Sequence, residues 1–112
     1  MRTFEAQEGF WNDGNVWVCE DGQRIAELDP HFEVINKSPT GFAWGYGGSG
    51  PAQLAFALLA AVIGTERASN PSLFQRYKFD VIGKLDKDKG FVITEDEIKK
   101  WVRDREREIL DA

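Results

Sequence analysis

The stretch from Ser38 to Leu54 constrains the fold more than any other, because five glycines and three aromatic residues stand directly before an apolar run. Glycine loses more backbone entropy on folding than other residues, so this density indicates positive φ angles or the close approach of another backbone or a ligand. Phe42, Trp44 and Tyr46 alternate with small residues. In an extended conformation, one face would carry the three rings and the other would be nearly bare backbone.

The run from Pro51 to Ile63 that follows is apolar all round except for Gln53. A helix without a polar face is buried, so we expect this segment to be the central helix of the core. Ser49 or Gly50 would cap its start, and Gly64 would end it. The run is too short to span a bilayer, and we expect no association with a membrane.

The N-terminal part, Arg2 to Leu28, has the pattern of β-strands. Two turn sequences that contain Asp-Gly, at 12–15 and 20–23, flank the strand-like run Val16 to Cys19. This spacing predicts a three-stranded antiparallel meander. In its middle strand, the single cysteine Cys19 most simply fills space as a small apolar residue.

Two further helices are expected after the apolar run, with a polar loop at Thr65 to Ser69 before the first of them. Asn70-Pro71 is a cap followed by a proline, and apolar residues recur at helical spacing from there to about Leu85. Phe91 to Ile93 would be a short extended piece. Thr94 to Glu97 has the capping-box pattern that starts a last helix, whose outer side carries solvated charges.

Together these patterns predict an α+β fold, in which a small antiparallel N-terminal β-meander packs against three α-helices and the first helix is buried. A chain of 112 residues without a linker-like tract is expected to be a single domain, residues 1–112. Its β part would cover about 1–47 and its helical part about 51–112.

The net charge of −5 lies entirely in the N-terminal half, because residues 1–56 carry three basic and eight acidic side chains whereas residues 57–112 carry eleven of each. An acidic surface repels the phosphates of nucleic acid and attracts basic partners. We therefore expect no direct contact with duplex nucleic acid. One cysteine and no apolar leader at the start of the chain favour a cytoplasmic protein.

The residues do not form a pattern typical of catalysis. His31 lies in a turn sequence with no nucleophile beside it, and Ser49 lacks the second glycine of a nucleophile elbow. We therefore do not expect an enzyme.

Metal binding finds little support in the sequence. Residues 86–97 resemble a calcium-binding EF-hand loop in their acids, but Gly90 offers no side-chain oxygen and Phe91 stands where the sharp turn needs glycine. Cys19 and His31 are too few to build a zinc site from cysteine and histidine. We expect no metal and no cofactor.

Two roles of the glycine stretch stay open. The amides of Gly48, Ser49, Gly50 and Ala52 could converge at a helix N-terminus, which favours a phosphate or carboxylate, with an aromatic ring stacked on a base. The other role is a purely structural turn, since neither a P-loop nor a dinucleotide-binding fingerprint is complete. The candidate residues for a ligand or a partner are Ser38, Thr40, Trp44, Tyr46, Gly47, Gly48, Ser49, Gly50 and Gln53.

Residues 38–59 read S-P-T-G-F-A-W-G-Y-G-G-S-G-P-A-Q-L-A-F-A-L-L. This segment resembles the signature of an uncharacterised family of small bacterial and phage proteins, a domain of unknown function. The rest of the chain is similar in outline, with Asp-Gly turns near the start and Phe-Gln-Arg-Tyr-Lys-Phe at 74–79. The resemblance implies a phage or mobile-element setting, core packing for Phe91, and no catalytic residue.

From these observations we expect a small non-enzymatic protein that binds another protein. With the resemblance, it would be encoded by a phage and act on a host protein such as the defence machinery, in the cytoplasm of the bacterial host. The alternative is a module that binds a nucleotide or another anion at the glycine turn.

Overall fold

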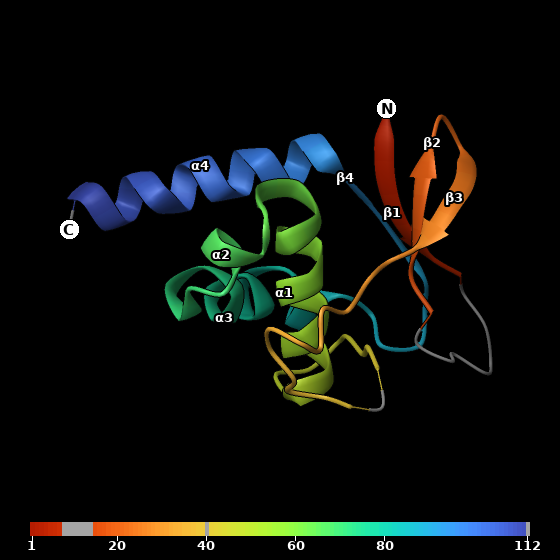
Figure 1. Cartoon of the computed structure of the whole chain (residues 1–112), viewed down its shortest axis with the longest axis horizontal. Coiled ribbons are helices and arrows are strands. Elements are labelled where there is room, and N and C mark those ends of the chain that lie inside the picture. The colour runs from red at the N-terminus through yellow and green to blue at the C-terminus, as the bar shows by residue number, and fades with distance from the viewer. Residues whose placement is uncertain (8–14, 40, 112) are drawn as a thin grey trace.

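The computed structural model describes residues 1–7, 15–39 and 41–111 (Figure 1). In chain order the elements are β1 (Arg2–Ala6), β2 (Trp17–Glu20), β3 (Gln23–Glu27), α1 (Ser49–Ile63), α2 (Thr65–Ala68), α3 (Pro71–Asp80), the 3₁₀ helix η1 (Ile82–Lys84), β4 (Phe91–Thr94) and α4 (Glu95–Asp111). The strands form a single antiparallel sheet and the helices lie on one side of the molecule, so the predicted α+β fold is confirmed (Figure 1).

The sheet has the strand order β3-β2-β1-β4. β1 to β3 form the predicted meander, and the turn at Asp21-Gly22 has positive φ angles of 51° and 85° at its two central residues, as a tight hairpin turn of type I′ requires. Most of the other predicted turn, at 12–15, lies outside the described residues.

β4 extends the meander from the far end of the chain. The sequence predicted an extended piece here without placing it in the sheet. It pairs antiparallel with β1, and Phe4 lies opposite Ile93. Phe91 and Ile93 are buried while Val92 between them is exposed, which is the alternation of a strand with one face on the core.

α1 is the central helix, as predicted. Every residue from Gly50 to Ala60 is buried, and the helix packs against α2, α3, α4 and η1. A single hydrophobic cluster joins the sheet to the helices, and it includes Phe4, Trp44 and Phe56. Of the helices described, none is long and apolar enough to cross a membrane.

Two local predictions after α1 were wrong. Thr65 to Ser69 is not a loop throughout but contains α2, because Gly64 ends α1 with a φ of 87° and its carbonyl then accepts from the amide of the buried Ala68. The next helix, α3, ends at Asp80 and not near Leu85. Val81 leaves the helical region with a φ of −124°, and the chain continues as η1.

Candidate functional site

The glycine stretch is an irregular loop that leads into α1, not an extended strand. Gly45 has a φ of 87°, a conformation that residues with side chains rarely adopt, and this breaks the alternation of the aromatic residues. Trp44 is therefore 2% exposed whereas Tyr46 is 51% exposed. The predicted single aromatic face is wrong, because the loop buries one ring and exposes the other.

Trp44 ties the loop to the C-terminal half of the chain. Its ring meets the ring of Phe91 on β4 edge-on, with the centroids 5.0 Å apart. The indole Nε1 donates a hydrogen bond of 2.9 Å to the carbonyl oxygen of Lys89. The core thus encloses the ring that was considered for stacking on a base, and a ligand at this loop would meet Tyr46 instead.

Gly45 also lets two backbones approach each other. Its amide donates to the carbonyl of Ile82 at 3.0 Å. A Cβ atom at this position would lie 2.5–2.7 Å from backbone and Cβ atoms of Lys87. The glycine is therefore required both by its φ angle and by the space available.

The start of α1 differs slightly from the prediction, because the N-cap is Gly48 and not Ser49 or Gly50. The ring of Tyr46 lies on Gly48, where an added Cβ would be 2.5 Å from Cε2 of the tyrosine. An added Cβ on Gly50 would be 2.7 Å from Cβ of Ala43. The glycines thus let the loop and the tyrosine ring lie directly against the first turn of the helix.

Gln53 is fully buried and binds the backbone of the loop before the glycine stretch. Its Oε1 accepts from the amides of Lys37 at 2.7 Å and Ser38 at 3.3 Å. Its Nε2 donates to the carbonyls of Pro30 at 2.7 Å and Ile35 at 2.9 Å. The structure brings Gln53 and Ser38 together, but both groups of the glutamine amide are occupied by the protein itself. Thr40 lies outside the described residues.

An exposed aromatic surface remains at the end of the loop. Phe79 on α3 is 58% exposed, and an added Cβ on Gly47 would be 3.4 Å from its Cε1. We call Tyr46, Gly47, Ser49 and Phe79 the Tyr46–Phe79 surface. Sequence reasoning missed Phe79, although an aromatic residue outside the apolar stripe of its helix was the available signal.

Lys78 completes the aromatic surface from beside Phe79. Its Nζ lies 4.2 Å from the centroid of the Phe79 ring, a cation–π distance. The whole residue is buried, at 8% exposure, so its charged end is covered in part by the Phe79 ring that it meets. The arrangement holds the Phe79 ring in place on the surface.

A cluster of possible metal ligands lies near the N-terminal part of α1. One ligand atom from each of Asp29, His31 and Glu33 lies within 4.8 Å of the others. Nδ1 of His31 is 3.1 Å from Oε1 of Glu33, and the amide of His31 donates to Asp29 at 2.8 Å. These contacts account for the cluster without an ion. The sequence patterns considered for a metal were the EF-hand-like acids of residues 86–97 and the pair of Cys19 and His31, and the Asp-x-His-x-Glu alternation at 29–33 was missed.

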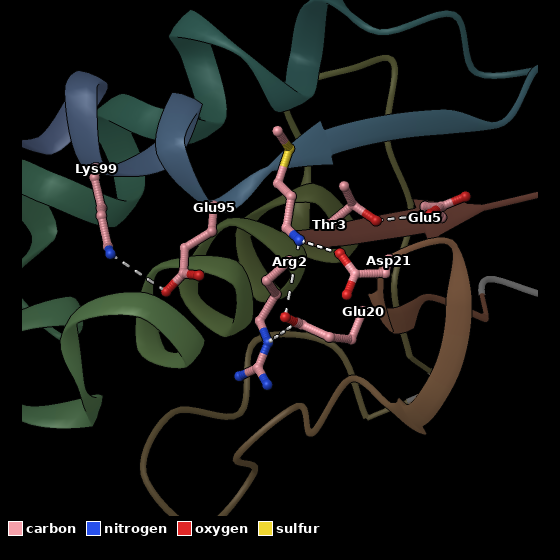
Figure 2. Close-up of polar contacts among 8 residues, drawn as sticks. Arg2, Thr3, Glu5, Glu20, Asp21, Glu95 and Lys99 are labelled. Atoms are coloured by element: carbon pink, nitrogen blue, oxygen red, sulfur yellow. Dashed lines mark hydrogen bonds and ion pairs between the residues drawn. The ribbon is translucent and has the colours of Figure 1, made fainter.

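At the other end of the molecule, ion pairs fasten β1 to the β2–β3 turn (Figure 2). The N-terminal ammonium bonds to Asp21, and Nε of Arg2 lies 3.3 Å from Oε2 of Glu20. The bond to the ammonium lowers the pKa of the Asp21 carboxyl. Part of the acidic excess of the N-terminal half is thus paired within the sheet.

Cys19 is buried on β2 and is not in a disulfide. Burial raises the pKa of its thiol, and the nearby Glu5 carboxylate raises it further. A thiol with a raised pKa has little thiolate at neutral pH and is a poor nucleophile. This agrees with the role of an apolar filler.

The model of a family of unknown function matches residues 8–104. The match includes the glycine stretch, Phe79 and β4. No curated protein and no solved structure matches the chain. Because the family match covers far more than half of the chain, the protein belongs to this family of unknown function, DUF6166.

Proposed function

We propose that the protein is a non-enzymatic binding protein that holds another protein at the Tyr46–Phe79 surface. The observation that carries this proposal is the exposure of two aromatic side chains, 51% for Tyr46 and 58% for Phe79, beside glycine backbone. Aromatic residues are enriched at the centres of protein interfaces, because they bury a large rigid area at a low entropic cost. Gly47 between them would let a partner approach the backbone closely.

Contacts with the segment before β4 hold the Tyr46–Phe79 surface in one conformation, and this favours tight binding. Trp44 is hydrogen-bonded to Lys89, and Gly45 is packed against Lys87, so the loop that carries Tyr46 is held at both sides. A surface that is ordered before binding loses less conformational entropy in the complex. The contact with Lys87 also explains why position 45 is a glycine.

For the partner, we propose a host protein such as a component of the defence machinery, with the protein encoded by a phage. The support for this is the resemblance of residues 38–59 to phage and bacterial proteins. The acidic excess of residues 1–56 favours a partner with a basic surface.

The test is recovery of a specific protein from a bacterial lysate with the tagged chain. Substitution of both aromatic residues, Tyr46→Ala with Phe79→Ala, should lower recovery at least about tenfold, since interface hot spots contribute about 2 kcal/mol or more each. Val92→Ala is the matched control, because Val92 is an exposed apolar residue on β4. A partner that is retained equally by the double variant would contradict the proposal.

The second candidate is a module that binds a nucleotide or another anion at the start of α1. It is favoured by one observation, namely that no described side chain caps this helix and no acidic residue stands in its first turn. A nucleotide at a hundred times its Kd would add about 2.7 kcal/mol to the stability. A melting temperature raised by nucleotides, and no longer raised in Tyr46→Ala, would replace the first proposal with this one.

A further inference from the structure

A groove on the far side of the molecule from the Tyr46–Phe79 surface is left unused by the proposed function. It has a volume of about 550 Å³ and lies between α4, from Lys99 to Asp111, the last turn of α1, and α2. α4 runs past α2 and α3 to the end of the chain (Figure 1). The residues of α4 that line the groove are Lys99, Val102, Arg103, Glu106, Arg107, Leu110 and Asp111.

These α4 residues form one face of the helix, since most of them recur at spacings of three and four. The face carries an apolar strip. Leu110 is 84% exposed, and it lies in the same groove as Val102 and the half-buried Val62 and Ile63 at the end of α1. An exposed leucine at the end of a half-buried strip offers apolar area to a partner.

The rim of the groove is cationic although the whole chain is acidic. Four cationic and two acidic side chains line it. Arg67 on α2 is paired with Glu106 at 2.6 Å, and Lys99 lies 3.6 Å from Glu95 (Figure 2). Arg103 and Arg107 are exposed, and neither forms a hydrogen bond or an ion pair with the described residues. Two arginines thus remain for an acidic partner.

We propose that this groove, the α4 groove, docks an acidic amphipathic helix of a partner protein. The apolar face of that helix would pack on Leu110 and on the half-buried Val62 and Ile63. Its carboxylates would pair with Arg103 and Arg107. A helix lying along α4 meets one of these side chains at each turn, because both helices repeat every 3.6 residues. Arginine binds carboxylates with two parallel hydrogen bonds, which fixes the orientation of the partner.

The α4 groove is independent of the Tyr46–Phe79 surface. The two lie at opposite ends of α1, whose 15 residues span roughly 20 Å. A result that contradicts binding at one site therefore does not contradict binding at the other. Tyr46→Ala should not change binding at the α4 groove.

The test uses a fluorescently labelled synthetic helix with leucine at positions i, i+3 and i+7, and with glutamate flanking this apolar face on both sides. Its binding to the protein is measured by fluorescence anisotropy. We expect Arg103→Glu with Arg107→Glu to weaken binding at least about tenfold, and Arg103→Lys with Arg107→Lys to weaken it less. Arg24→Glu with Lys84→Glu is the matched control. It changes the net charge equally on exposed residues outside the groove.

The location of binding is checked by nuclear magnetic resonance, in which the amide signals of Arg107 and Leu110 should shift most. The same helix with lysine in place of glutamate should bind at least about tenfold more weakly. Equal binding of the two helices, no binding by either, or equal loss in the control pair would overturn the proposal. Self-association of the chain that is lost in the arginine variants would also overturn it, because the occupant would then be a second copy.

Discussion

At the scale of single residues, Gln53 shows how a polar side chain is accommodated inside an apolar helix. A buried amide without hydrogen-bond partners would cost several kcal/mol. Gln53 avoids this cost because its two polar groups bond to four backbone groups of one loop. The side chain therefore replaces, for that loop, the backbone pairing that a strand would have provided.

Gln53→Ala should lower the free energy of unfolding by about 2–4 kcal/mol, because it leaves several buried backbone groups unpaired and removes packed atoms. Gln75→Ala on α3 is the matched control, since Gln75 is half-buried and forms no hydrogen bond with the described residues. Urea denaturation followed by circular dichroism measures both. Equal losses in the two variants would show that the loop does not depend on Gln53.

Tyr77 is a residue that couples the stability of the core to alkaline pH. It is 2% exposed, and its ring meets Trp101 edge-on with the centroids 4.9 Å apart. Burial raises the pKa of its hydroxyl, and the Glu97 carboxylate raises it further. The folded protein therefore keeps this proton in a pH range where the unfolded chain loses it.

As the pH rises above about 10, the ordinary pKa of tyrosine, the unfolded state should gain up to about 1.4 kcal/mol per pH unit from ionisation of Tyr77. Stability from this group is complete below that pH and falls above it. Tyr77→Phe keeps the ring and should remove this part of the decline. Urea denaturation of both proteins between pH 9 and 11 gives the comparison, and parallel declines would contradict the assignment.

At the scale of elements, the loop from Ser38 to α1 owes its shape to Gly45. The residue has a φ of 87° and lies against the backbone of Lys87. Gly64, at the end of α1, has the same φ of 87° but has nothing within 4 Å of the position of a Cβ. Alanine variants at these two glycines therefore separate two contributions to the free energy of unfolding: the strain of a positive φ angle, and the steric clash with Lys87.

Gly64→Ala should cost about 1–3 kcal/mol for the strained backbone alone, because a φ of 87° with a ψ of 159° is a conformation that essentially only glycine adopts. Gly45→Ala should cost at least about 2 kcal/mol more, because the loop must also move away from Lys87. The free energies of unfolding of the two variants give this difference directly. Similar losses would mean that only the φ angle of Gly45 matters.

The elements that the sequence predicts well are those with local chemistry. Asp21-Gly22 forms its hairpin turn, Asn70 accepts from the amide of Ser72 at the start of α3, and Thr94 and Glu97 form the capping box of α4. In each case the interacting groups are within three residues of one another. These two helix starts and this tight turn were therefore predictable, whereas the cap of α1, which has no side-chain hydrogen bond, was not.

Features that depend on distant parts of the chain were not predictable in the same way. The period-two pattern of Phe42 to Tyr46 suggests a strand, but the backbone of Lys87 next to Gly45 decides the conformation there. The candidate site was found in part. Tyr46, Gly47 and Ser49 are on the surface, whereas Trp44 and Gln53 serve the core and Phe79 comes from another helix.

At the scale of the whole molecule, β4 connects the N-terminal sheet to the C-terminal helices in one packed unit. It pairs with β1 in the sheet and leads directly into α4, while Trp44 from the middle of the chain packs on its Phe91. The N-terminal sheet therefore shares its core with the helices. We expect the protein to unfold in a single cooperative step.

Ile93→Ala, in the middle of β4, should lower the free energy of unfolding by about 2–5 kcal/mol, since Ile93 is buried beside Phe4. The midpoints measured by tryptophan fluorescence and by far-ultraviolet circular dichroism should shift together in urea. Val92→Ala, one residue away on the exposed face, should have a much smaller effect. Separate transitions for the two signals would show that the sheet and the helices unfold independently.

The pairing of β1 with β4 also has a consequence for synthesis on the ribosome. Thr3 lies opposite Thr94, and at about 5–20 residues per second the second strand emerges roughly 5–20 seconds after the first. During that interval the edge of β1 that will bind β4 is open to other chains. Every new copy therefore passes through an interval in which an unpaired strand edge can pair with another chain.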